Sequence, residues 1–172
     1  LTHLTSTGTV PCKACPAGRE FVNKTSPCSI CVAGKYQNSL NSINATCLSC
    51  TGGYILDDPT HITEHDNSTD CKYCPPGKEF VSTTSECQIC THSTYQNQTD
   101  VPYLSCRTCP TNKYQPDQRG EAVAHDQFED CFDCAPGKFA DAGNRVCDSC
   151  VGGTEQDGST CRSCDVGQFS SS

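Results

Sequence analysis

The sequence has no tryptophan and no methionine, and it is poor in the residues that form hydrophobic cores. Leu, Ile, Val and Phe together account for 26 of the 172 residues, about 15%. A chain below roughly 20% rarely buries enough apolar surface to offset its conformational entropy. This composition excludes an ordinary globular domain, so covalent crosslinks or bound metal must replace the missing core.

Basic residues are also few, and long hydrophobic runs are missing. Twelve Lys and Arg stand against 20 Asp and Glu, which gives a net charge of −8. No basic stripe is present to neutralise phosphates, so nucleic-acid binding is disfavoured. No apolar run approaches the length of a membrane span, and we expect no direct membrane insertion. Because the chain has neither Met nor a signal peptide, we expect a processed or partial form of a longer product.

Cysteine, in contrast, is abundant: there are 18, and every one belongs to a C-x-x-C pair. The nine pairs are separated by intervals of 12, 15 and 20 residues, then 12, 15 and 21, then 12 and 10. This pattern indicates an internal repeat with a period of 59 to 60 residues. We expect three cysteine-rich repeats, at residues 1–70, 71–130 and 131–172, of which the third is shorter.

A smaller unit follows each C-x-x-C pair. The residue three positions after the second cysteine is Gly in seven of nine cases, Gly53 among them, and the exceptions are Ser93 and Asn112. Gly at this place predicts a tight turn with positive φ. An aromatic residue follows within three positions in every unit except the one after Cys150. We predict a small disulfide-rich repeat protein, an elongated rod of short β-hairpins and irregular loops with little or no helix.

Three kinds of chemistry use the C-x-x-C motif: thiol redox catalysis, zinc binding and disulfide formation. Redox catalysis is disfavoured because nine copies occur without a βαβ pattern. Four-cysteine zinc sites would consume the pairs two at a time, which leaves one pair over and breaks the three-pair register. Structural disulfides in an oxidising compartment fit the pattern best. We therefore predict no metal site, no cofactor and, with every cysteine committed, no enzymatic activity.

Four N-x-[ST] sequons support an extracellular location, secreted or at the cell surface. They begin at Asn23, Asn44, Asn67 and Asn97. Each lies in a loop between cysteine pairs, where an N-linked glycan would not collide with the crosslinks. A chain rich in Asn and Thr produces one or two sequons by chance, whereas four in loops indicate secretion. We predict N-glycosylation at most or all of the four.

The cysteine connectivity is formally open, and the repeat narrows it. Bonds within a C-x-x-C pair would constrain nothing distant, and first-to-third pairing would break the three-pair register. Joining the second cysteine of one pair to the first cysteine of the next respects every repeat. The predicted bonds are Cys15–Cys28, Cys31–Cys47, Cys50–Cys71, Cys74–Cys87, Cys90–Cys106, Cys109–Cys131, Cys134–Cys147 and Cys150–Cys161. The result would be a quasi-one-dimensional rod.

This pairing leaves Cys12 and Cys164 without a partner. Eight residues follow Cys164 and eleven precede Cys12, and the 19 together nearly equal the long intervals of 20 and 21. We predict an inter-unit disulfide between Cys164 and Cys12 of the next copy. That copy either continues the same polypeptide or is a neighbouring subunit in an open filament. The alternative is that the two terminal cysteines pair locally.

Two acidic clusters contain histidine: His65-Asp66 with Asp70, and His125-Asp126 with Glu129 and Asp130. Such clusters could hold calcium or form a pH-sensitive contact, but they are more often solvated loops. We expect solvated loops here.

The tandem motif C-x-x-C-P-x-G-x-[FY] resembles the ephrin-receptor-like cysteine-rich repeats of extracellular proteins. Each loop is also similar to the first submodule of tumour-necrosis-factor-receptor cysteine-rich repeats. The nine cysteine pairs, the glycines and the aromatics carry the resemblance over essentially the whole chain. It implies an extracellular disulfide-bonded rod with a role in adhesion, scaffolding or ligand display. Ser93, the missing aromatic after Gly153 and the long acidic loops at 51–70 and 110–130 depart from the pattern.

We expect a structural extracellular glycoprotein, the repeat unit of a disulfide-stabilised fibre or surface coat assembled head to tail from copies of itself. The alternative is a ligand-binding or stalk ectodomain of a surface receptor or surface antigen. The regular spacing favours the first. A binder would carry one loop that departs from the repeat and exposes aromatics or Arg. The loop at 110–130, with Tyr114, Arg119 and Phe128, is the only candidate.

Overall fold

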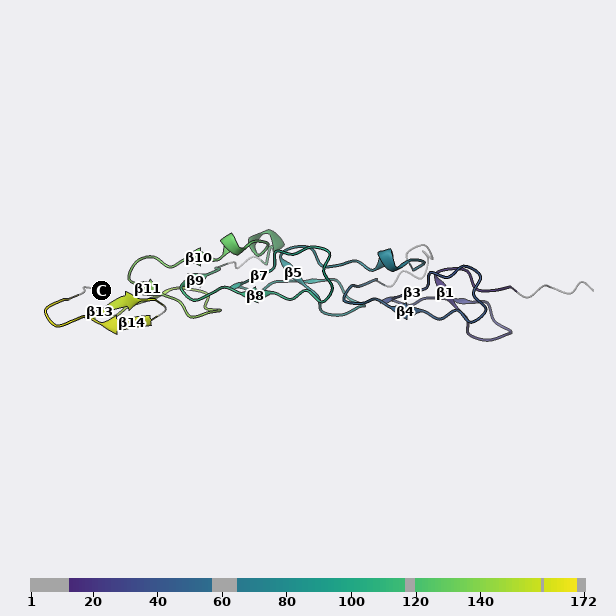
Figure 1. Cartoon of the computed structure of the whole chain (residues 1–172), viewed down its shortest axis with the longest axis horizontal. Helices are drawn as coiled ribbons and strands as arrows, with labels where there is room; N and C mark the ends of the chain where they lie inside the picture. Colours follow the sequence, from purple (N-terminus) through teal and green to yellow (C-terminus); the bar gives the residue numbers. More distant parts are fainter. Residues whose placement is uncertain (1–12, 57–64, 117–119, 159, 170–172) are drawn as a thin grey trace, which may run out of the picture.

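The chain forms an elongated rod in which successive segments of the sequence follow one another along the long axis (Figure 1). The computed structural model describes residues 13–56, 65–116, 120–158 and 160–169. Within these ranges every sheet has two antiparallel strands, and no α-helix occurs. The predicted fold class, a disulfide-rich chain of short hairpins, is confirmed.

Each hairpin pairs the two residues after a turn with the two residues inside the next C-x-x-C motif. Six hairpins have two-residue strands, and the last one, β13–β14, has four-residue strands. The pairs are β1 (Arg19–Glu20) with β2 (Ser29–Ile30), β3 (Lys35–Tyr36) with β4 (Leu48–Ser49), β5 (Lys78–Glu79) with β6 (Gln88–Ile89), β7 (Thr94–Tyr95) with β8 (Arg107–Thr108), β9 (Lys113–Tyr114) with β10 (Phe132–Asp133), β11 (Lys138–Phe139) with β12 (Asp148–Ser149), and β13 (Thr154–Asp157) with β14 (Thr160–Ser163). A single bridge between Tyr54 and Lys72 takes the corresponding place between β4 and β5.

Eight disulfides close the loops, each with its Cα atoms 5.6 to 5.7 Å apart. They join the second cysteine of one motif to the first cysteine of the next, the pairing that the repeat register favours. We call each closed segment a unit. Units 1 to 8 span residues 15–28, 31–47, 50–71, 74–87, 90–106, 109–131, 134–147 and 150–161, and a ninth begins at Cys164. In the chain-entropy model each loop closure contributes about 3 kcal/mol.

The turn at the start of each unit has positive φ, as predicted, with one correction. The turn residues are Gly18, Gly34, Gly52, Gly77, Ser93, Asn112, Gly137, Gly153 and Gly167, with φ between 58° and 91°. In unit 3 this conformation belongs to Gly52 and not to Gly53, so the sequence assignment of Gly53 was wrong by one residue. Two adjacent glycines make either position available to positive φ, and both lie against main chain: a Cβ at Gly52 would be 2.5 Å from the Tyr103 nitrogen, and a Cβ at Gly53 would be 2.9 Å from the Lys72 carbonyl oxygen.

In the ranges that the structure describes, the loops contain three single 3-10 turns: η2 (Ser68–Asp70), η3 (Ala122–Ala124) and η4 (Phe128–Asp130). A capping box holds η2 and η4: the carboxylate of the third helical residue accepts from the N-cap main chain, at 2.8 and 2.9 Å. These turns lie just before Cys71 and Cys131, at the ends of the two long loops.

The buried apolar residues are mostly the cysteines themselves. One cluster consists of Cys50, Ile55 and Cys71, and Tyr36 of the preceding unit packs against it. A second consists of Cys74, Cys87 and Leu104, and Tyr54 of the preceding unit packs against it together with Phe80. In these two clusters the aromatic residue of one unit covers the disulfide of the next unit. A series of small hydrophobic clusters therefore takes the place of one central core.

Candidate functional site: the joints between units

Successive units are joined by two repeated main-chain hydrogen bonds. In the first, the N–H of the second cysteine of a C-x-x-C motif donates to the carbonyl of the turn residue one unit earlier. It recurs at Cys31–Gly18, Cys50–Gly34, Cys90–Gly77, Cys109–Ser93, Cys134–Asn112, Cys150–Gly137 and Cys164–Gly153, at 2.8 to 3.0 Å. In the second, the turn N–H donates to a carbonyl in the next unit: Gly18–Gln37, Gly34–Ile55, Gly77–Gln96, Ser93–Gln115 and Asn112–Ala140, at 2.7 to 3.2 Å. Because main-chain groups make both bonds, the joint tolerates changes of side chain.

The turns also contact the loop two units further along the rod. A Cβ on Gly34 in unit 2 would lie 2.6 Å from the Thr83 hydroxyl in unit 4. A Cβ on Gly77 in unit 4 would collide with the carbonyl oxygen of Ala122 in unit 6. Gly52 in unit 3 meets unit 5 in the same way. Glycine is therefore required at these turns by close approach as well as by φ.

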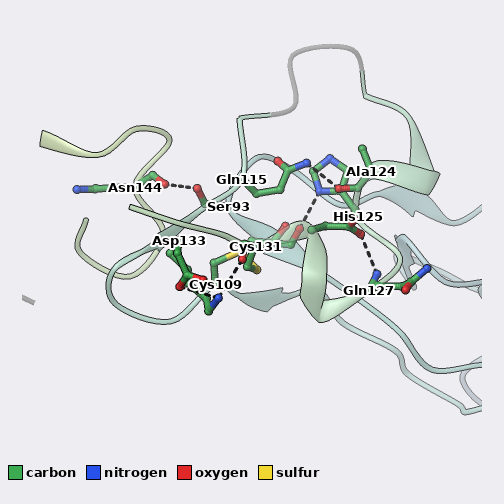
Figure 2. The surroundings of a disulfide bond; sticks show 12 residues. Ser93, Cys109, Gln115, Ala124, His125, Gln127, Cys131, Asp133 and Asn144 are labelled. Atoms are coloured by element: carbon green, nitrogen blue, oxygen red, sulfur yellow. Dashed lines mark hydrogen bonds and ion pairs between the residues drawn. A yellow bond between two sulfur atoms is a disulfide. The ribbon is translucent and has the colours of Figure 1, made fainter. Parts of the chain in front are cut away.

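At the two turns without glycine, the side chain replaces the close approach with a hydrogen bond. The Ser93 hydroxyl in unit 5 donates to the Asn144 carbonyl in unit 7, and Figure 2 shows the two residues facing each other. The Asn112 amide in unit 6 donates to the Gly158 carbonyl in unit 8. The departures from glycine therefore preserve the contact between alternate units. No local sequence pattern predicts the register of these contacts, because the register depends on how far each unit advances along the rod.

His65 and His125 are buried, so the expectation of solvated loops is wrong for both. Their side chains are 0% and 1% exposed. The Nδ1 atoms lie 2.8 Å from the Lys35 carbonyl and 2.7 Å from the Thr94 carbonyl, and because a carbonyl can only accept, each Nδ1–H is the donor. The main-chain carbonyl of His65 accepts from the Gln37 N–H, and that of His125 accepts from the Gln96 N–H, each at 2.8 Å. Figure 2 shows His125 seated beside Gln115 and Ala124.

These histidines fasten the long loops of units 3 and 6 to the unit before. The sequence signal for this role is the recurrence of His-Asp at equal distances before Cys71 and Cys131, with a further Asp directly before each of these cysteines. Asp70 and Asp130 are engaged as caps of η2 and η4. In the described part of the chain no group of three or more His, Cys, Asp and Glu is placed to hold a metal ion.

The four sequon asparagines are exposed and lie in units 1, 2, 3 and 5. The Asn23 Oδ1 accepts from the main-chain N–H of Thr25 and of Ser26, at 2.9 and 2.8 Å. The Asn67 Oδ1 caps η2 by accepting from Thr69 N–H at 3.1 Å. These bonds involve only the side-chain oxygen. The turn therefore holds the side chain in one orientation while Nδ2, the atom to which a glycan would be attached, makes none of these bonds. N-glycosylation itself stays a prediction.

The loop at 110–130 uses its aromatic residues within the rod. The Phe128 ring meets the Tyr95 ring edge-on at 5.7 Å, and the Lys113 ammonium lies 5.3 Å from its centroid. Tyr114 is half-buried and tilts against Phe132 at 6.3 Å. Arg119 lies outside the described residues. The contacts of Tyr114 and Phe128 serve packing between units.

Cys164 is the one free cysteine among the described residues, and it is half-buried. Its N–H donates to the Gly153 carbonyl at 3.0 Å, so it occupies the same place as the second cysteine of the six other joints that make this bond. Cys12, its predicted partner, lies outside the described residues, and the inter-unit bond stays a prediction.

No protein-family model matches the chain, and no curated protein matches its sequence. No helix within the described ranges has the length and apolar character that crossing a membrane requires. Eight disulfides among the described residues of this 172-residue chain indicate a cysteine-rich repeat protein. Their number favours an extracellular or secreted location, because reducing compartments do not maintain them.

Proposed function

We propose that the protein is a structural extracellular glycoprotein, the repeat unit of a disulfide-stabilised fibre or surface coat assembled head to tail. The observation that carries this proposal is the recurrence of one kind of joint. The same cysteine-to-turn hydrogen bond is made at seven of the eight described joints, through to Cys164, and the bridge between Tyr54 and Lys72 takes its place at the Cys74 joint. A rod built from one repeated joint can be lengthened by adding units without a new kind of contact.

The covalent link between copies would be a disulfide from Cys164 to Cys12 of the next copy. Cys164 is placed like the cysteines that open units 2, 3 and 5 to 8, yet it has no disulfide partner among the described residues. Forming the bond removes two protons and two electrons from two thiols. A disulfide oxidoreductase or a small-molecule disulfide of the secretory route would accept them by thiol–disulfide exchange.

The tandem C-x-x-C-P-x-G-x-[FY] motif supports the proposed extracellular structural role, because it resembles ephrin-receptor-like and tumour-necrosis-factor-receptor-like repeats. We include in the proposal N-linked glycans at Asn23, Asn44, Asn67 and Asn97, which would solvate a rod with little core. A non-catalytic role is part of it too. Phe128 and Tyr114, the residues that would have marked a ligand-binding loop, support packing instead.

The test combines electron microscopy of native material with peptide mapping under non-reducing conditions. We expect filaments, and a crosslinked peptide that contains Cys12 and Cys164. The assembly is repeated with a mixture of isotope-labelled and unlabelled chains. A disulfide between subunits yields crosslinked peptides that carry one labelled and one unlabelled half, whereas a disulfide within one chain does not. Dispersed monomers with a Cys12–Cys164 bond inside one chain would contradict the proposal.

A further inference from the structure

The sequon that begins at Asn44 is built into the joint between units 1 and 2. The Asn44 side chain is exposed, but the middle residue of the sequon, Ala45, is only 2% exposed. The Ala45 carbonyl accepts from the Phe21 N–H of unit 1 at 2.8 Å, and the Cys47 N–H donates to the Glu20 carboxylate of the same unit at 3.4 Å. The acceptor asparagine therefore reaches solvent while the main chain beside it is held against unit 1.

Unit 5 repeats this arrangement, which shows that it belongs to the fold of the unit. Leu104, the residue 59 positions after Ala45, is 5% exposed, and its carbonyl accepts from the Phe80 N–H of unit 4 at 2.7 Å. The Cys106 N–H donates to the Glu79 carboxylate at 3.1 Å. The segment before the closing cysteine is thus held against the preceding unit in both copies.

The sequon that begins at Asn97, also in unit 5, has a different setting. Asn97 and the two residues after it are all exposed. Asn97 precedes the closing cysteine Cys106 by nine positions, whereas Asn44 precedes Cys47 by only three. At about 5–20 residues per second, three residues are synthesised in less than about one second. Unit 2 can therefore close almost as soon as its sequon has been made.

From this arrangement we infer that Asn44 accepts a glycan only before the Cys31–Cys47 disulfide closes, so that oxidation of unit 2 regulates the occupancy of this sequon. This regulation rests on the proposed glycosylation of the chain and adds an order of events to it. The transferring enzyme has to bind the asparagine, the hydroxyl of the third residue and the main chain between them. In the closed unit that main chain is buried at Ala45, and the enzyme can reach it only after local opening.

The two competing reactions use different groups of unit 2. In glycosylation, the Asn44 Nδ2 forms a bond to the anomeric carbon of an oligosaccharide carried on a lipid diphosphate. The bond from that carbon to the diphosphate oxygen breaks, the lipid diphosphate leaves with its electron pair, and Nδ2 loses one proton. In closure, the thiols of Cys31 and Cys47 lose two protons and two electrons to a disulfide oxidoreductase. Disulfide formation takes seconds or longer, and this interval is the time available for transfer.

The test uses the full oxidised chain, produced without N-glycans in a bacterial periplasm, with a purified oligosaccharyltransferase and its lipid-linked oligosaccharide. Glycopeptide mapping over time measures the rate of transfer at each sequon. We expect transfer at Asn44 to be at least about tenfold slower than at Asn97, because the enzyme acts only on the minor population in which unit 2 has opened. Equal rates at the two asparagines would overturn the inference.

A pair of matched variants tests the role of the unit 2 disulfide. Cys31→Ser with Cys47→Ser should raise transfer at Asn44 toward the rate of an exposed sequon. The control is Cys90→Ser with Cys106→Ser, which opens a loop of the same sequence separation, 16, in unit 5. The control should leave Asn44 slow. An equal gain at Asn44 in both variants would reject the inference, because general loosening of the rod would then control the reaction.

A sequon moved to unit 5 tests the structural reason for slow transfer. Tyr103→Asn with Ser105→Thr creates a sequon around the buried Leu104, at the position that corresponds to Asn44. Asparagine tolerates the φ of 56° at this position. In the oxidised chain the new sequon should accept a glycan as slowly as Asn44 does, while Asn97 in the same unit stays fast. Rapid transfer to the new sequon would show that the buried middle residue does not protect it.

The outcomes separate this inference from the proposed function. If material from a secretory host has four unmodified asparagines, the proposed glycoprotein fails, while the cell-free rates still decide whether closure protects Asn44. If the oxidised chain is modified as fast at Asn44 as at Asn97, the regulation by closure fails, and the proposed fibre and its glycans stand.

Discussion

At the scale of single residues, the turn position decides how alternate units meet. Where the neighbouring loop approaches closely, as at Gly34 and Gly77, only the absence of a Cβ permits the contact. Where it stands further off, the side chain of Ser93 or Asn112 donates a hydrogen bond across the gap. The same backbone conformation therefore serves two kinds of contact.

A first prediction follows for Gly77→Ala. The new Cβ would meet both an unfavourable φ of 79° and the Ala122 carbonyl, so we expect a loss of about 2–4 kcal/mol in the free energy of unfolding. Gly120→Ala has a φ of 68° and no described atom within 4 Å, and it should cost about 1 kcal/mol. Denaturant unfolding with the disulfides intact measures both values. Equal costs would show that backbone conformation alone matters at Gly77.

A second prediction concerns the exposed asparagines. We expect N-glycans at Asn23, Asn44, Asn67 and Asn97, or at most of them, in material from a secretory host. The side-chain oxygens of Asn23 and Asn67 are held in local turns that should persist after Nδ2 is modified. Glycopeptide mapping with enzymatic deglycosylation measures the occupancy. Four unmodified asparagines would argue against the secreted, solvated rod.

At the scale of the element, the unit is a hairpin closed by a disulfide and tied to units on both sides. Unit 5 shows this: its Cys90 N–H donates to the Gly77 carbonyl in unit 4, its Ser93 N–H donates to the Gln115 carbonyl in unit 6, and the Ser93 hydroxyl donates to the Asn144 carbonyl in unit 7. A central unit therefore supports more neighbours than a terminal one does.

The element scale gives a third prediction, the removal of one disulfide at two positions. Replacing Cys90 and Cys106 by Ser should cost about 3 kcal/mol and should speed amide exchange in units 5, 6 and 7. Replacing Cys150 and Cys161 opens a loop near the end and should affect chiefly units 6 to 8. Hydrogen exchange read out by mass spectrometry resolves the units. A strictly local effect of the unit 5 variant would show that the joints couple neighbours weakly.

The unit could be predicted from the sequence, and the contacts between alternate units could not. Turn, strand, loop and return are fixed by residues a few positions apart, so Gly18, Tyr36 and the C-x-x-C spacing were enough to describe them. The contact between Thr83 and Gly34 depends on the distance that each unit advances along the rod. No local sequence pattern encodes that distance. The choice between Gly52 and Gly53 could not be predicted either, because both residues are glycine and each lies against the main chain of another segment. The burial of His65 and His125 does not follow from the acidic composition of their loops, and only the recurrence of the His-Asp pair in both long loops indicates it.

At the scale of the whole molecule, the crosslinks carry the stability that a core supplies elsewhere. Most of the buried apolar residues are half-cystines, and the aromatic residues pack on disulfides. We predict that complete reduction converts the rod into a disordered chain without an intermediate globular state. Small-angle scattering and far-UV circular dichroism before and after reduction measure this change. A reduced chain that kept the rod-like distance distribution would contradict it.

The redox state gives a fifth prediction for the intact protein. Alkylation without a reductant should modify no more than two thiols, those of Cys12 and Cys164, because the other 16 cysteines are in disulfides. Intact mass spectrometry counts the labelled sites, and elemental analysis should find no zinc. Stoichiometric zinc with thiols that react freely would replace the disulfide assignment.

The disulfide pattern also determines how the rod responds to tension. A pulling force applied at the two ends follows the shortest covalent route, which crosses each loop through its disulfide and uses only the short C-x-x-C segments between them. The loops are therefore shielded from the load, and the molecule can lengthen very little while the bonds are intact. Reduction would release all of that stored chain length at once, at about 3.3–3.6 Å per residue. Inextensibility under oxidising conditions is thus a mechanical property already set by the spacing of the cysteines.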